Sequence, residues 1–265
     1  MKTSRLAIAG VAVFAVVGLV AACGPKNGNA GGRLTATASP SPVRTPKAAV
    51  AASVEPLVTS TYRFTITSAA FTGEGSRDVQ DRVARVTGTG VADGVSMKID
   101  FMRVDDDAYA KLDFGPLNSQ FGIQSDMYLH LDLSNLAGTA GRPLNLTGAP
   151  IDVGGLLTGL NNDVETTDGK TYAGTIDLTK ATGDVAPDAD VLRNVGDKAK
   201  SVPFTTKLDD QGRLTDLKID GGSIAPQLAF DVAVTGYGAA TNVVEPDASQ
   251  VVEAPDSVLK ILGGQ

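Results

Sequence analysis

Residues 202–219 read VPFTTKLDDQGRLTDLKI, and no other stretch indicates the architecture of the chain as directly. In its first half, Val202, Phe204, Thr206 and Leu208 stand at alternate positions, which is the period of a strand with one buried face. The following DDQG interrupts the alternation with Asp and Gly, the residue types that supply the positive φ of a tight turn. The stretch therefore predicts an antiparallel hairpin with one strand on each side of that turn.

The same alternation of apolar and polar residues recurs along most of the chain. Asp-Gly sequences such as Asp93-Gly94 and Asp168-Gly169 separate the runs and mark further tight turns. Since strict alternation is typical of half-buried antiparallel strands, the pattern predicts a meander. We expect about ten strands, near 62–72, 82–92, 95–104, 108–114, 126–133, 162–168, 170–179, 202–209, 213–220 and 227–236.

Three segments favour helix instead of strand. We expect a short helix within 48–60, interrupted or started near Pro56, and two more at 150–160 and 187–200, where apolar residues recur at helical spacing. Helices do not follow each strand, so the sequence does not predict βαβ units. The predicted fold class is α+β, with one large, twisted antiparallel sheet and a few short helices against one face.

The composition excludes several kinds of site. One cysteine and one histidine in 265 residues exclude a disulfide framework and a Cys/His zinc site, and a Ser-His-Asp triad would need His130 as its base. We expect His130 to face solvent and the run Asp105–Asp107 to form a solvated turn without calcium. A net charge of −7 argues against a nucleic-acid partner. We expect no catalytic, metal-binding or cofactor-binding residue, no cofactor and no enzymatic activity.

The first residues have the pattern of an exported, lipid-anchored protein. Lys2 and Arg5 precede the apolar run LAIAGVAVFAVVGLV, which is short for a membrane span and typical of a signal peptide. The run ends in VAACG, and a cysteine at this place resembles the bacterial lipobox. We interpret 1–22 as a lipoprotein signal peptide and Cys23 as the lipidated first residue of the mature chain. The alternative is a plain secretory signal whose cleavage site lies near a cysteine.

Residues 23–47 differ in composition from the rest of the chain. They are rich in Gly, Ser, Thr and Pro, and they carry four basic residues and no acidic one. Such a segment cannot bury enough apolar surface to offset its ordering entropy, so we expect a flexible tether. Its basic residues either attract an anionic lipid surface or keep the tether soluble. We expect a single domain at 48–265.

Several segments together resemble a known family. In chain order they are a lipobox, a tether, TYRFTITS, MKIDFMRVDDDAYAKLDFG, YLHLDLSNLAG, PIDVGGLLTGLNN, DGKTYAGTIDLTKATG, VPFTTKLDDQGRLTDLKID and LAFDVAVTGYG. Over roughly residues 48–250, this order resembles the LppX/LprG-type lipid-carrier lipoproteins of actinobacteria. The resemblance implies a curved half-barrel sheet with short helices on its concave face. It also implies an apolar cavity between them that binds acylated lipids or glycolipids and carries them across the cell envelope.

The resemblance implies further partners and a location. The protein would sit on the extracytoplasmic face of the cell membrane, attached through Cys23, with a membrane transporter as a further partner. Strand parity selects the residues of the apolar face that would bind lipid, and the helices add three leucines. The expected lipid-binding residues are Phe64, Ile66, Met97, Ile99, Phe101, Leu129, Leu131, Leu156, Leu157, Leu192, Phe204, Leu208, Phe230 and Val232.

Two other functions stay open on the sequence alone. The first is a non-catalytic envelope module for interaction or sensing, with a solid core and no lipid ligand. The second is an enzyme that acts on envelope glycans or lipids, which would need convergent carboxylates with raised pKa in a cleft. The absence of Trp disfavours a sugar-processing site, because such sites usually offer aromatic platforms.

Overall fold

The described part of the chain begins at residue 44, shortly before the expected start of the domain at residue 48. All described residues belong to one compact unit that spans 43–265, and the first helix starts at Pro46. The expected signal peptide, Cys23 and most of the tether lie outside the described residues. The computed structural model describes residues 44–92, 94–132, 151–183, 185–255 and 258.

The helices are all short, as the sequence predicts. Thr45 caps the first one by accepting a hydrogen bond from the N–H of Ala48, and Pro56 begins the second. The α-helices are α1 (Pro46–Ala52), α2 (Pro56–Thr59), α3 (Asn118–Phe121), α4 (Val153–Leu157) and α5 (Ala189–Val195). The 3-10 helices are η1 (Gly115–Leu117), η3 (Leu178–Lys180), η4 (Gly196–Ser201), η5 (Pro226–Leu228) and η6 (Ala248–Gln250).

Two helices are shorter than the sequence predicts. α4 covers only part of 150–160, because Gly159 and Leu160 leave the helix to pair with the backbone near Ile176 at the sheet edge. α5 covers only part of 187–200, because Gly196 has a φ of 62° and ends it, and the chain continues as η4.

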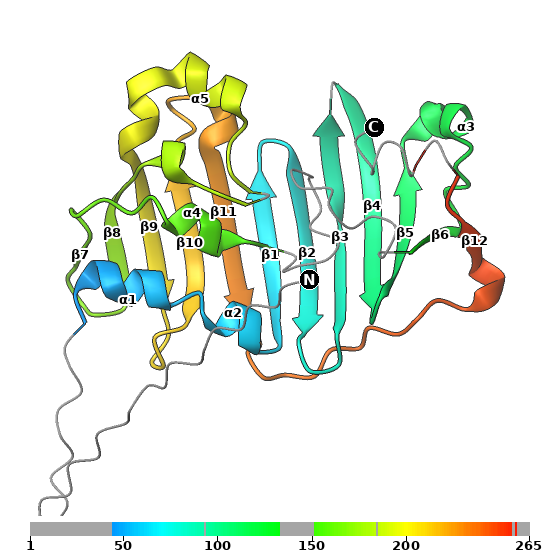
Figure 1. Cartoon of the computed structure of the whole chain (residues 1–265), viewed down its shortest axis with the longest axis horizontal. Coiled ribbons are helices and arrows are strands. Elements are labelled where there is room, and N and C mark those ends of the chain that lie inside the picture. The colour runs from blue at the N-terminus through cyan, green and yellow to red at the C-terminus, as the bar shows by residue number, and fades with distance from the viewer. Residues whose placement is uncertain (1–43, 93, 133–150, 184, 256–257, 259–265) are drawn as a thin grey trace, which may run out of the picture. The chain divides into compact units, whose positions relative to one another are not determined.

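Twelve strands form one open sheet in the order β12-β6-β5-β4-β3-β2-β1-β11-β10-β9-β8-β7 (Figure 1). Neighbours are antiparallel throughout, except for the parallel pair β12–β6, and β1 joins β11 at the centre. The α+β fold with one large sheet and a few short helices is therefore confirmed. The strands are β1 (Tyr62–Ser68), β2 (Phe71–Asp78), β3 (Val83–Ala92), β4 (Val95–Val104), β5 (Asp107–Asp113), β6 (Tyr128–Asp132), β7 (Glu165–Thr166), β8 (Thr171–Ile176), β9 (Val202–Leu208), β10 (Leu214–Asp220), β11 (Ala229–Thr235) and β12 (Val251–Glu253).

β2 is a strand that the sequence pattern does not reveal. The pattern predicts one strand over 62–72, whereas β1 ends at Ser68, whose hydroxyl accepts a hydrogen bond from the N–H of Phe71 at 3.1 Å across the turn. β2 then reads FTGEGSRD, with Gly73 and Gly75 at positions where other strands carry apolar side chains. Glycine erases the alternation on which the prediction depends.

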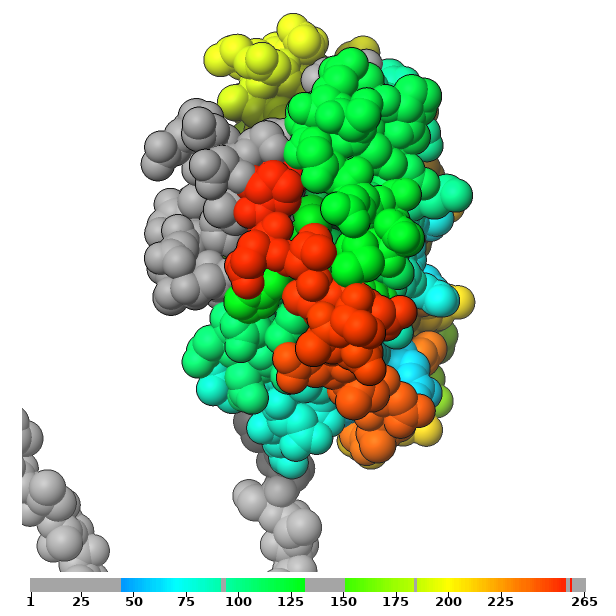
Figure 2. Space-filling model, turned by 90° about the vertical axis from the view of Figure 1, so that its right-hand side faces the viewer, coloured from blue at the N-terminus to red at the C-terminus, as the bar shows by residue number. Residues whose placement is uncertain are grey.

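β12 is the second unexpected strand. Its three residues lie beside β6, with Val251 next to Tyr128 and Glu253 next to His130. Figure 2 shows the C-terminal segment, in orange and red, against the green edge of the molecule that includes β6 and α3. A parallel pair joins segments that are far apart in the sequence, so no local turn signal marks it.

The register of the strands assigns residues to two faces. Directly opposed residues point to the same side of a sheet, so a row of cross-strand neighbours defines a face. One such row consists of Tyr172, Thr206, Leu217, Val232, Ile66, Gly73, Gly88, Ile99 and Leu112. We call the face that carries this row the inner face. The opposite face, which carries Arg63, Thr65 and Lys218, is the outer face.

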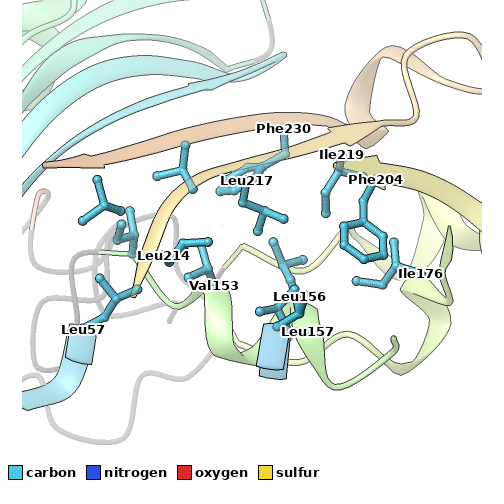
Figure 3. Packing of buried hydrophobic residues seen from close by; sticks show 14 of the residues in the cluster. Leu57, Val153, Leu156, Leu157, Ile176, Phe204, Leu214, Leu217, Ile219 and Phe230 are labelled. Carbon is cyan, nitrogen blue, oxygen red and sulfur yellow. The ribbon is translucent and has the colours of Figure 1, made fainter. Parts of the chain in front are cut away.

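Two core clusters lie on the inner face. In the first cluster, α1, α2 and α4 pack on β1 and β8–β11, and the side chains of Val153, Leu156 and Leu157 lie against those of the sheet (Figure 3). The second cluster covers β4–β6 and includes Ile123 after α3 and the C-terminal Val258. β2 and β3 run between the strands of the two clusters, and Val86 of β3 belongs to the first cluster.

Candidate functional site

A partly open pocket of about 240 Å³ lies on the inner face. It forms where one end of β1, β10 and β11 meets α4, η3 and the segment that leads into α5. The pocket therefore lies between the sheet and the helices on its inner face, the position in which the resemblance to the LppX/LprG-type lipoproteins implies a cavity. Its lining residues are Ile66, Ser68, Ala69, Ala70, Phe71, Leu156, Leu178, Val185, Ala186, Pro187, Asp188, Val191, Ile219, Gln227, Leu228, Ala229 and Phe230.

The pocket is apolar inside and polar at its rim. Asp188 and Gln227 are exposed to solvent, whereas Leu156 and Leu228 are buried. The hydroxyl of Ser68 is engaged in the β1–β2 turn, where it also donates to the carbonyl oxygen of Phe71 at 3.2 Å. A pocket of this character favours a hydrocarbon group over a charged one.

The volume limits what the pocket holds in this conformation. Pockets for drug-sized ligands usually measure about 300–1,000 Å³. At about 240 Å³, this one suits a single hydrocarbon segment and is small for a whole acylated lipid. A larger ligand would need a further surface next to the pocket.

Such a surface lies beside the pocket on β2 and β3. Gly73, Gly75, Gly88 and Gly90 occupy adjoining inner-face positions of these two strands, and we call them the glycine floor. An added Cβ at Gly73 or Gly88 would lie 2.7 or 2.5 Å from Cζ of Phe71. Glycine in a strand marks a place where another group approaches the backbone closely, and here that group is an aromatic ring.

Phe71 connects the pocket, the glycine floor and both core clusters. Its ring lies over Gly73 and Gly88, whereas the ring of Phe64 lies over Gly75. Phe71 also lines the pocket and packs against the first and the second cluster. The residue is only partly buried. Phe71 is therefore the side chain whose rotation would join the pocket to the floor.

The structure divides the expected lipid-binding residues into three groups. Ile66, Leu156 and Phe230 line the pocket. A second group belongs to or packs on the first core cluster, and a third belongs to or packs on the second cluster. The second group is Phe64, Leu157, Leu192, Phe204, Leu208 and Val232, and the third is Met97, Ile99, Phe101, Leu129 and Leu131.

Sequence reasoning missed Phe71 and most of the pocket residues around α5. The alternation along a strand predicts which residues lie on the inner face. It does not predict which of those residues border a void and which pack against each other. Val185 and Pro187 stand in the segment before α5, where no strand alternation exists. The signal that could have pointed to Phe71 is the pattern FTGEG, an aromatic residue followed by glycine at alternate positions.

His130 lies on the outer face, but the side chain is only 25% exposed. Its Nε2 is 2.8 Å from Oδ1 of Asp107, and its Nδ1 is 3.2 Å from Oε1 of Glu253. The hydrogen bond to Asp107 raises the pKa of His130 above its usual value; burial opposes this, and Glu253 adds to it. On the outer face the imidazole is thus partly exposed and paired, because β12 brings Glu253 beside it.

Two features are absent from the described residues. They contain no group of three or more His, Cys, Asp or Glu side chains arranged to hold a metal ion. In the same part of the chain, no helix combines the length and the apolar character needed to cross a bilayer.

Comparison with known proteins adds no relative. No model of a known protein family matches the chain, and a search of curated proteins finds no match. The resemblance to the LppX/LprG-type lipoproteins therefore stays a prediction, and the function is inferred from the fold and the pocket.

Proposed function

We propose that the protein is a membrane-anchored lipoprotein that binds acyl chains on the inner face of its sheet and carries lipids across the cell envelope. The apolar pocket between the sheet and its helices is the observation that carries this proposal. The signal-peptide pattern and Cys23 supply the anchor, and the sequence resemblance supplies the class of ligand.

The proposed mechanism is transfer of hydrocarbon between apolar surroundings without covalent chemistry. Removing apolar surface from water is favourable by about 25 cal/mol per Å², which holds a chain in the protein as it does in a bilayer. Because both environments are apolar, the exchange is nearly balanced and depends on access. Rotation of Phe71 provides that access, since it would uncover the glycine floor next to the pocket.

A pocket-filling variant tests the proposal. Ala70 is exposed and lines the pocket, so Ala70→Trp places an indole ring where the acyl chain would lie. Excluding two methylene groups, each worth about 0.8 kcal/mol, would weaken lipid uptake about tenfold. Ala51→Trp, at an exposed alanine of α1 outside the pocket, is the matched control and should bind like the wild type.

The measurement is native mass spectrometry of the protein extracted from membranes, combined with uptake of a fluorescent acylated lipid. Co-purified lipid that is lost in Ala70→Trp and kept in Ala51→Trp is the expected result. Absence of lipid from the wild type, together with no uptake, would contradict the proposal.

The close packing of the inner face favours a second candidate function. Most of the expected lipid-binding residues contact one another in the two core clusters, as they would in a solid interaction or sensing module. That candidate predicts that Ala70→Trp fills an unused pocket and stabilises the protein without any effect on lipids.

A further inference from the structure

The inner face carries two arginines at the end of β1–β4 away from the pocket. Tyr62, Arg77, Ala84 and Arg103 are successive cross-strand neighbours on these four strands. On each strand they lie two positions from Phe64 or one of its cross-strand neighbours. Their side chains therefore point to the inner face, as that of Phe64 does. Charged groups on an otherwise apolar face call for an explanation, because burying an unpaired charge is costly.

Tyr62 and Arg77 both contain a buried donor without an acceptor. Tyr62 is 0% exposed, and within the described residues neither its hydroxyl nor Nη1 of Arg77 has a hydrogen-bonding partner. Burial raises the pKa of the Tyr62 phenol, and Arg77 opposes that rise through its positive charge and its closeness to the phenol oxygen. A guanidinium only donates hydrogen bonds, so Arg77 cannot accept the phenol hydrogen, and a buried donor left without an acceptor points to one supplied by a ligand.

The neighbouring carboxylates do not supply that acceptor. Asp105 and Asp106 lie in the β4–β5 turn, and both pair with Arg82, at 3.5 and 2.5 Å. The Nε of Arg103 donates to the backbone oxygen of Asp105 at 2.9 Å. Arg77 forms no salt bridge with Asp105 or Asp106.

We propose that Tyr62 and Arg77 bind an oxyanion of the lipid headgroup, a phosphate or a carboxylate. A guanidinium and a phenol both donate hydrogen bonds, and a charged oxygen is the acceptor that matches them best. The inference rests on the proposed lipid-binding function. It adds that the ligand is an anionic lipid and fixes which end of the inner face holds its headgroup.

The position of this pair agrees with the position of the pocket. Tyr62 and Ile66 lie on the same face of β1, four residues apart, which corresponds to about 13 Å along the strand. Gly73 and Gly75 of the glycine floor lie beside β1 over this interval. The ring of Phe64 covers Gly75 and that of Phe71 covers Gly73 and Gly88, so an acyl chain would run from a headgroup at Arg77 to the pocket only when both rings turn aside.

Three probes with the full lipoprotein test the inference. They are dioleoyl phosphatidic acid, dioleoylglycerol with the same acyl chains and no charge, and inorganic phosphate alone. We expect the wild type to bind phosphatidic acid at least about tenfold more tightly than dioleoylglycerol, as a charge-assisted hydrogen bond provides. Arg77→Gln and Tyr62→Phe should reduce this ratio toward one and leave the affinity for dioleoylglycerol unchanged.

Two further variants separate a binding role from a folding role. Arg77→Lys keeps the charge and should restore part of the preference for phosphatidic acid. Arg63→Gln removes a charge from the outer face of the same region and should leave the ratio unchanged. Thermal melting of each variant shows whether a lost preference reflects unfolding.

The outcomes distinguish this inference from the proposed function. Equal binding of the two lipids by the wild type would overturn the headgroup site and leave acyl-chain binding intact. Binding of neither lipid would overturn the proposed function itself, and phosphate binding in that case would assign the pair to a free anion. Competition of phosphate with phosphatidic acid, lost in Arg77→Gln, supports the inference.

Discussion

His130 joins two segments that are far apart in the sequence. Asp107 begins β5, and Glu253 ends β12, more than a hundred residues later. Tyr109 lies next to the imidazole on the same face and donates its hydroxyl to Oε1 of Glu245 at 2.6 Å. At this place, single residues hold the C-terminal segment against the sheet.

The contribution of His130 to stability should depend on pH. Its pKa is raised in the folded state, chiefly by Asp107, so the stabilisation is complete below the unfolded value of about 6.5 and is lost as pH rises through the higher folded value. We expect His130→Gln to lower the free energy of unfolding by about 0.5–1 kcal/mol at pH 5.5 and by less at pH 8.5.

Urea unfolding of both proteins at several pH values measures this difference. Asp107→Asn is the matched variant, because it removes the largest cause of the raised pKa and should lose the same pH dependence. A difference between wild type and His130→Gln that stays constant or grows toward pH 8.5 would contradict the prediction.

The strand pair β2–β3 is built around the absence of side chains. Gly88 faces Gly73 across the pair, and the ring of Phe71 covers both positions. Glycine in a strand interior lowers the stability of the strand, and the packing of Phe71 on Gly73 and Gly88 offsets part of that loss. The pair β2–β3 is thus stabilised by one aromatic ring and by its neighbouring strands β1 and β4.

Gly88→Ala should destabilise the protein. The new Cβ would lie 2.5 Å from both Cζ of Phe71 and the backbone oxygen of Thr72, so the ring and the backbone must move. Overpacking of this kind costs about 1–3 kcal/mol. Chemical denaturation measures it, with Thr89→Ala on the outer face of the same strand as the control. Equal stability of both variants would show that Phe71 moves freely.

At the scale of the whole molecule, the sequence predicts an anchor and a tether before the sheet. If Cys23 carries the lipid, Cys23→Ala should prevent incorporation of labelled palmitate and release the protein from the membrane fraction. Fractionation and metabolic labelling measure both effects, and Cys23→Ala should fold like the wild type because Cys23 lies outside the compact unit that spans 43–265. Continued membrane attachment of Cys23→Ala would contradict the assignment of the anchor.

The sequence predicts most strands because their signal is local. Alternation from Val202 to Leu208, followed by an Asp-Gly turn, is complete within eighteen residues, and the hairpin β9–β10 forms as expected. The same reasoning fails for β2, where glycine replaces the apolar residues, and for β12, whose partner β6 lies more than a hundred residues away.

The sequence predicts which residues lie on the inner face of the sheet, but not which of them line the pocket. Alternation identifies Ile66 and Phe230 as inner residues, and both line the pocket. It also selects Phe204 and Leu131, which are closely packed in the two core clusters. Whether an apolar side chain borders a void depends on what lies opposite, and that is set by helices that come from other parts of the chain.

Local sequence was enough to specify the strand periodicity and the turns, and it alone carries the pattern around Cys23 that predicts export, because each depends on neighbouring residues. The folded chain alone established that β1 joins β11, that Phe71 covers glycines, and that Tyr62 and Arg77 stand together on the inner face. The physical reason is that these contacts depend on register and packing between distant segments, which no local pattern of residues encodes.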